Sequence, residues 1–207
     1  MRSRLTRSLG AAALVVASAI GVAACGDDAA PSAQVSATEH NDADVEFASD
    51  MLQHHAQALS MVDLTLGRPL DPEVQRLADG IRDAQVPEIE TFTDWLTEWG
   101  EEVPATMRDH VNAGHDSHDL SESMAELDHG DMPGMLSAED MERLQGSPDP
   151  EFQTLWLELM VEHHTGAVEM AEAHRSEGRY EPAVDLAGEI AESQSAEIER
   201  MRSLIGS

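Results

Sequence analysis

Cysteine and lysine are the residues that this chain of 207 residues lacks most clearly. It has one cysteine, Cys25, and no lysine, so that all 12 basic residues are arginine. A single cysteine excludes an intramolecular disulfide, and its place in a predicted leader leaves the mature chain without a thiolate for metal binding. Aromatic residues make up only 3% of the chain and no alternating polar and apolar run stands out. Strands are therefore not expected.

The N-terminal segment has the pattern of an export signal. Three arginines precede an apolar run at residues 9–24 that is short and rich in small residues, unlike a transmembrane helix. The run ends in VAACG, which resembles a lipobox, the bacterial signal whose cysteine becomes lipidated. We expect residues 1–25 to be a lipoprotein signal peptide with Cys25 as its lipidation site; the alternative is a plain signal peptide with an incidental cysteine. Residues 26–41 are small and polar and predict a flexible tether, so the protein is expected to be lipid-anchored on the extracytoplasmic face of the cell membrane.

Acidic residues dominate the mature chain. Without the three leader arginines, 9 arginines stand against 41 acidic residues, a formal net charge of −32. This charge disfavours nucleic acid and anionic lipid headgroups as partners and favours cations, although an acidic surface is also a common aid to solubility. The sequence offers no nucleophile–base pair and no phosphate-binding loop, which argues against hydrolases and kinases.

One segment of the chain occurs twice. MLQHHAQALSM at residues 51–61 aligns with MVEHHTGAVEM at 160–170, an offset of 109 positions. The same offset matches residues 77–90 with 186–199 without a gap. We interpret the domain, residues 42–207, as two copies of one helical hairpin, 42–103 and 149–207, joined by a long connection at 104–148.

The periodicity of each copy predicts two amphipathic helices. Apolar residues recur at steps of three and four, and the stripe of each first helix passes through the adjacent histidines. A kink is expected at Pro87, and LSAEDMERL predicts a short helix with Ser137 as its N-cap. Because one hairpin buries its stripes poorly, the sequence predicts an all-α, ferritin-like four-helix bundle with all four stripes inward. The predicted stripes of the second helices are Leu77, Ile81, Ala84, Glu88, Phe92 and Trp95 in copy one, and Leu186, Ile190, Ser193, Glu197, Met201 and Leu204 in copy two.

These stripes carry ionisable residues, which are costly to bury unless they are paired or bind a metal. Imidazole suits copper, zinc, iron and nickel, and thioether sulfur selects for copper, above all Cu(I). We therefore expect a metal site in the bundle; the alternative is a polar network that fixes the register of the helices, with the methionines as packing. The candidate ligands are His54, His55, His163, His164, Met51, Met61, Met160, Met170, Glu88 and Glu197, with Gln85 and Gln194 expected one turn before the glutamates and nearer the edge of the face.

The connection is a second candidate for metal binding. Between residues 107 and 141 it holds nine nitrogen or sulfur ligands without a cysteine, a composition typical of weak, flexible copper sites. The alternative is an acidic loop in which these residues occur by coincidence. The nine are His110, His115, His118, His129, Met107, Met124, Met132, Met135 and Met141.

The duplicated segments and the connection resemble a secreted bacterial family, domain of unknown function 305. Its marks are D-x-x-F-x-x-x-M-x-x-H-H-x-x-A-x-x-M in two copies and M-P-G-M-x-S/T between them. Here they read DVEFASDMLQHHAQALSM, PEFQTLWLELMVEHHTGAVEM and DMPGMLSAEDMERL. The resemblance spans residues 40–205 and implies a ferritin-like four-helix fold and a link to copper outside the cytoplasm. It points to the eight histidines and methionines of the two copies, and to Met132 and Met135, whose role it does not define.

Three functions are compatible with these features. The favoured one is a membrane-anchored protein that binds copper for sequestration, buffering or delivery and has no catalytic activity. A metal-dependent oxidase in the bundle core and an interaction module with structural histidine pairs are the alternatives. A di-iron oxidase is disfavoured, because neither QHH nor EHH has a glutamate three residues before an inward histidine. The sequence leaves open the metal, the number of sites and the oligomeric state.

Overall fold

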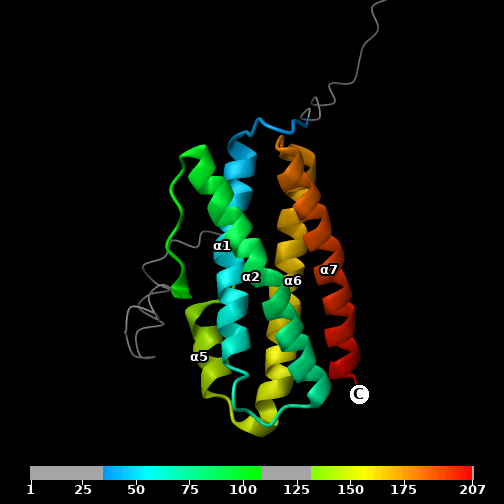
Figure 1. Ribbon diagram of the computed structural model, residues 1–207. Helices are drawn as coiled ribbons and strands as arrows, with labels where there is room; N and C mark the ends of the chain where they lie inside the picture. The colour runs from blue at the N-terminus through cyan, green and yellow to red at the C-terminus, as the bar shows by residue number, and fades with distance from the viewer. Residues whose placement is uncertain (1–34, 109–131, 207) are drawn as a thin grey trace, which may run out of the picture. The chain divides into compact units, whose positions relative to one another are not determined.

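The computed structural model describes residues 35–108 and 132–206. Its helices all belong to one compact unit, Ser32–Ser207, and no strand forms among the described residues. The predicted all-α fold is therefore confirmed, whereas the expected leader and Cys25 lie outside the described residues. The helices are α1 (Asp42–Asp63), α2 (Pro72–Trp99), α5 (Ala138–Gly146), α6 (Asp149–Glu177) and α7 (Glu181–Ile205) (Figure 1).

Local sequence signals account for most helix ends. Asn41 and Asp44 form a capping box at the start of α1. Asp71 caps α2, with Pro72 in the first turn, and Gly100 ends that helix in the left-handed conformation at φ 78°. Ser137 caps α5, as expected. Helix α2 continues through Pro87.

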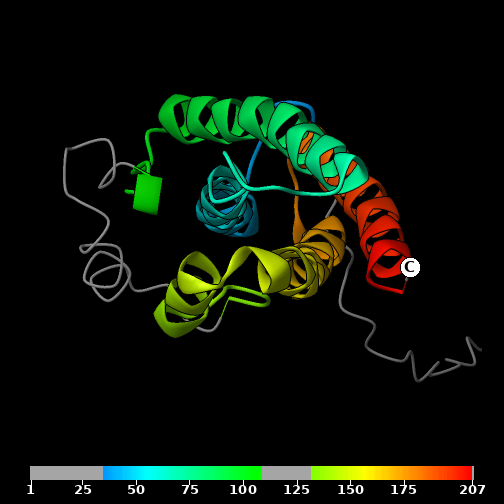
Figure 2. The same cartoon turned by 90° about the horizontal axis from the view of Figure 1, so that it is seen from below.

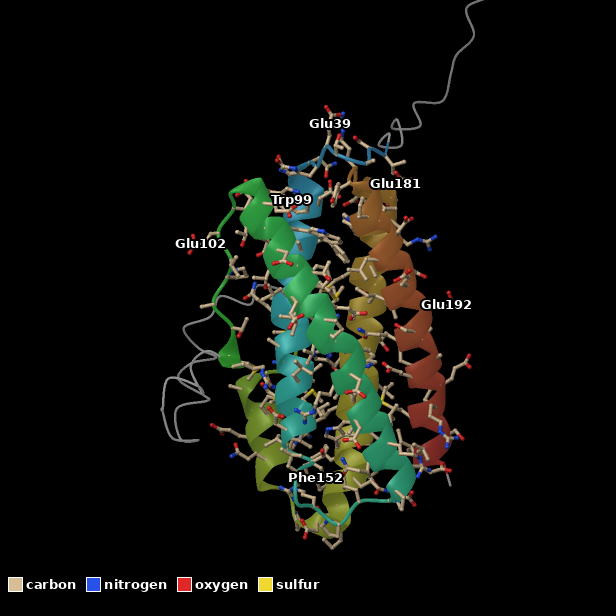
Figure 3. The ribbon with its side chains drawn as sticks, viewed as in Figure 1. Glu39, Trp99, Glu102, Phe152, Glu181 and Glu192 are labelled. Carbon is tan, nitrogen blue, oxygen red and sulfur yellow. The ribbon has the colours of Figure 1, made fainter. Side chains whose placement is uncertain are left out.

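The four long helices form two antiparallel hairpins, α1 with α2 and α6 with α7, and the hairpins meet where α1 packs against α6 (Figure 1). Viewed along the bundle, α1 lies between α2 on one side and α5 and α6 on the other (Figure 2). Trp99 and Phe152 mark opposite ends of the bundle (Figure 3). Trp156 links the hairpins through its indole N–H, which donates to the Met61 carbonyl at 2.9 Å.

The inward faces of α2 and α7 are rotated by about one residue from the predicted stripes. Ala84 and Ser193 were expected to face inward, yet both are exposed. Both faces bury alanine and a glutamine at equivalent positions, Ala78 and Gln85 in α2 and Ala187 and Gln194 in α7. The buried residues are Val74, Ala78, Ile81, Gln85, Phe92 and Leu96 in α2, and Ala183, Ala187, Ile190, Ala191, Gln194, Ile198 and Met201 in α7.

The end of the predicted tether is bound to the helical unit. Ser36 exchanges backbone hydrogen bonds with Arg179 and Glu181, at 2.6 and 2.8 Å. The buried carboxylate of Asp44 accepts from the backbone N–H groups of Arg179 and Tyr180 at 3.0–3.1 Å, and thereby caps α7, which has no capping side chain of its own. None of the helices within 35–108 and 132–206 has the length and apolar character of a membrane span.

Candidate metal centre

The four predicted histidines meet in one buried layer at the crossing of α1 and α6. His54, His55 and His164 are fully buried and His163 is 1% exposed. The rings of His54 and His163 stand 3.8 Å apart at an angle of 43°, and those of His163 and His164 stand 6.2 Å apart. The layer separates two apolar clusters, one around Trp156 and one around Phe92. The duplication has therefore placed its histidine pairs face to face.

Three of the four rings are fixed in one tautomer by an acceptor. His55 Nε2 lies 2.7 Å from Glu88 Oε2, and His164 Nε2 lies 2.8 Å from Glu197 Oε2. His54 Nε2 lies 3.1 Å from the carbonyl oxygen of Pro133. Because carbonyl and carboxylate oxygens only accept, each Nε2 carries a proton and donates it; in the neutral form of such a ring, Nδ1 holds the lone pair.

The remaining ring nitrogens of the layer are buried without a hydrogen-bond partner among the described residues. They are Nδ1 of His54, His55 and His164, and both nitrogens of His163. A buried acceptor without a partner costs free energy. A metal-binding histidine shows this same arrangement, with one nitrogen held by an acceptor and the other facing the ion.

Burial keeps His54 and His163, the inner pair of the histidine layer, neutral. The pKa of His54 is lowered to about 3, chiefly by desolvation and then by the nearby charge of His55. The pKa of His163 is lowered well below its ordinary value, first by desolvation and next by His54. Neutral imidazole is the form that binds a metal, so both rings are in the ligating form at neutral pH.

The glutamines were expected near the edge of the inward face and the glutamates within it, but the structure shows the reverse. Gln85 and Gln194 are 2% and 3% exposed and lie in the core. The side chains of Glu88 and Glu197 are 18% and 22% exposed and lie at the edge. The reason is the rotation of α2 and α7 described above. Each glutamate therefore orients a histidine from the rim of the layer, where its charge keeps some contact with water.

The four helix methionines lie on both sides of the histidine layer. Because α1 and α6 are antiparallel, Met51 shares the cluster around Phe92 with Met170, and Met61 shares the cluster around Trp156 with Met160. Met51, Met61 and Met160 are fully buried, and Met170 is half-buried. Thioether sulfur is thus present in the apolar clusters above and below the imidazoles.

The connection reaches the layer through the MPGM segment. The Pro133 carbonyl binds His54, and the Gln57 side chain accepts from Leu136 N and donates to Leu136 O at 2.8 and 3.0 Å. Sequence reasoning missed Gln57 and Gly166, against which this segment packs; the glycine within a histidine-bearing helix was the available signal. Met132 and Met135 flank the turn and are half-buried. Met107 and Met141 are buried in the apolar cluster around Trp156, while His110, His115, His118, His129 and Met124 lie outside the described residues.

The donor atoms in and around the layer are imidazole nitrogen and thioether sulfur. Cu(I) accepts both, and methionines lie in the clusters on both sides of the histidines. Among residues 35–108 and 132–206, no three His, Cys, Asp or Glu side chains are arranged to hold a metal ion.

The family model of a domain of unknown function (DUF305) matches residues 44–205. The chain belongs to this family. A DUF305 protein of Streptomyces coelicolor that is predicted to be secreted is 30% identical, with a TM-score of 0.64 over 79% of this chain and 92% of that one. A DUF305 fragment from Deinococcus radiodurans is 28% identical, with a TM-score of 0.62 over 80% and 97%. A search of the curated proteins found no match.

Structures of CopM are also similar to this DUF305 chain. CopM in its Cu(I)-bound form is 25% identical, with a TM-score of 0.58 over 78% of this chain and 94% of CopM. Its Cu(II)-bound form gives a TM-score of 0.60 over 79% and 95%, and a silver-bound form gives 0.57. A protein of this fold therefore binds soft metal ions in crystals.

Proposed function

We propose that this DUF305 protein binds copper outside the cytoplasm, anchored to the membrane through a lipid on Cys25, and that it sequesters, buffers or delivers the ion without catalysis. The observation that carries the proposal is that Nδ1 of His54, His55 and His164 is buried without a hydrogen-bond partner among the described residues, while the opposite ring nitrogens are held by Pro133, Glu88 and Glu197. A polar network evolved only for packing would satisfy these nitrogens.

Copper is favoured over harder ions by the chemistry of the surroundings. The layer offers neutral imidazoles, and the clusters on both sides of it add thioethers. The described carboxylates that contact the layer, Glu88 and Glu197, lie at its rim, where they already bind His55 and His164. The similarity to CopM, crystallised with Cu(I), Cu(II) and silver, supports the same choice. Copper is the cargo in this proposal, and the acidic surface of the chain attracts the cation.

A metal titration with two complementary variants tests the proposal. Cu(I), Cu(II) and Zn(II) are titrated into the purified protein, with a chromophoric chelator as competitor for Cu(I). One variant changes His54, His55, His163 and His164 to Gln, and a matched variant changes the four histidines of the connection to Gln. We expect tight Cu(I) binding in the wild type and in the connection variant, and its loss in the layer variant.

The other outcomes are equally informative. Copper binding kept in the layer variant and lost in the connection variant would assign the site to the connection. The absence of copper binding in the folded wild type would leave the histidines as structural residues and overturn the proposal. Tighter binding of Zn(II) than of Cu(I) would refute the choice of a soft metal.

A further inference from the structure

The MPGM segment forms a β-turn whose type decides where one carbonyl points. Met135 N donates to Met132 O at 3.3 Å, with Pro133 and Gly134 at the two central positions. Gly134 has φ +75°, the value of the third residue in a type II turn, for which proline and glycine are the preferred central pair. A type I turn would orient the central peptide the other way. The type II turn is therefore what directs the Pro133 carbonyl to His54 Nε2.

The two copies have diverged at one equivalent position to receive this turn. The offset of 109 pairs Gln57 in α1 with Gly166 in α6. Gln57 holds Leu136, just after the turn, by two buried hydrogen bonds to its backbone. At Gly166 a Cβ would collide with the Pro133 carbonyl and with Gly134 N. The same position thus hydrogen-bonds the connection in copy one, and in copy two its lack of a side chain lets the connection pack closely against the helix.

The turn also supplies a hydrogen-bond acceptor for one inner histidine, which the duplicated helices do not provide. The outer histidines, His55 and His164, each have a glutamate from the following helix. The inner histidines have no such carboxylate in the described chain. His54 receives its acceptor from the connection, whereas neither nitrogen of His163 bonds to a carboxylate or to the connection among the described residues. The inner pair is therefore unequal, although His54 and His163 occupy equivalent positions in the two copies.

We propose that the turn Met132–Met135 is a positioning element of the site: its Pro133 carbonyl, held in place by Gln57 and admitted by Gly166, fixes His54 with the proton on Nε2 and its Nδ1 lone pair available for the metal. The role in metal binding rests on the proposed function, whereas the control of the His54 tautomer does not require a metal.

Side-chain ¹⁵N NMR of the metal-free protein separates positioning from simple packing. Long-range ¹H–¹⁵N spectra report which nitrogen of each imidazole carries the proton. The test variant is Gln57→Ala, which removes both bonds to Leu136. The control is Gln53→Ala, one turn earlier on α1, whose amide bonds only Ser49 of its own helix. We expect a single Nε2–H tautomer for His54 in the wild type and the control, and a mixture in the test variant with His55 and His164 unchanged.

Cu(I) affinity is then measured on the same three proteins. Loss of a partner of a ligating histidine weakens metal binding about 10- to 100-fold, and we expect about a tenfold loss for Gln57→Ala and none for Gln53→Ala. If Gln57→Ala does not fold, Pro133→Ala, at a half-buried position, loosens the turn and should shift the tautomer in the same direction.

The outcomes keep the two proposals apart. A wild-type His54 with the proton on Nδ1, or an unchanged tautomer in the folded Gln57 and Pro133 variants, would overturn the positioning role. A tautomer shift with unchanged Cu(I) affinity would overturn the role in metal binding alone. The expected shift in a wild-type protein that binds no copper would sustain the control of His54 and remove the proposed function.

Discussion

Acidification should destabilise the metal-free protein through its inner histidines. In the unfolded chain an imidazole has a pKa of 6.5, whereas in the fold the pKa of His54 is lowered to about 3 and that of His163 well below its ordinary value. Between about pH 6.5 and pH 3, the His54 imidazole is therefore protonated in the unfolded state but not in the folded state. Stability is complete above pH 6.5 and falls as the pH drops below it, continuing until the folded state also takes up the proton near pH 3.

The size of the effect follows from the two pKa values. Between pH 7.5 and 5.0, a group with an unfolded pKa of 6.5 and a folded pKa of about 3 costs about 2 kcal/mol of unfolding free energy. His163, whose pKa is lowered well below its ordinary value, adds to this loss in the same direction, and the loss from His54 alone is already a large part of the stability of a marginal domain. His174, whose pKa is also lowered by burial, acts in the same direction.

Urea unfolding followed by tryptophan fluorescence at pH 7.5, 6.5, 5.8 and 5.0 measures this loss. The companion variant has His54 and His163 changed to Gln. Carboxylate repulsion, which relaxes on acidification, is common to both proteins, so the difference between them isolates the two imidazoles. The wild type should lose about 2 kcal/mol more than a single His54→Gln variant. It should lose more than that relative to the double variant, because the lowered pKa of His163 acts in the same direction. Parallel stability curves for wild type and variant would refute the assignment of neutral, buried imidazoles.

Two further substitutions test contacts outside the histidine layer. Asp44→Ala leaves the backbone N–H groups of Asn41, Arg179 and Tyr180 without their buried acceptor. Calorimetry should show that the free energy of unfolding falls by about 3 kcal/mol. A melting temperature within about 2 °C of wild type, which corresponds to a much smaller change in stability, would contradict this role of Asp44. Gly166→Ala forces a methyl group into the Pro133 carbonyl and should cost about 1–3 kcal/mol. Gly188→Ala is the control, because its new methyl would meet only the Arg175 side chain at 3.6 Å; it should leave the stability unchanged or raise it. Equal changes in stability for the two glycine substitutions would refute the tight packing at Gly166.

Short-range sequence patterns determined much of this protein. The offset of 109 identified the two hairpins, and the capping residue Ser137 marked a helix start that the structure confirms. The steps of three and four placed His54 and His163 on inward faces. Such signals are readable because helix periodicity and capping depend on residues a few positions apart.

The exact inward face of α2 and α7 was decided by tertiary packing. Neighbouring residues on a helix differ by only 100° in direction, so a stripe centred on Ala84 and one centred on Gln85 fit the same apolar pattern. In the fold α2 buries the face with Ala78 and Gln85, and Glu88 lies at the rim. Periodicity alone does not distinguish these two solutions.

The partners of the histidines also came only from the fold. His54 and the Pro133 carbonyl are 79 positions apart, as are Gln57 and Leu136, and no local pattern encodes a pairing over that distance. The sequence contained every candidate ligand, together with the proline and glycine of the turn. The tertiary structure decided which ring nitrogens are held by acceptors and which remain for an ion, because this depends on where the connection crosses the two copies.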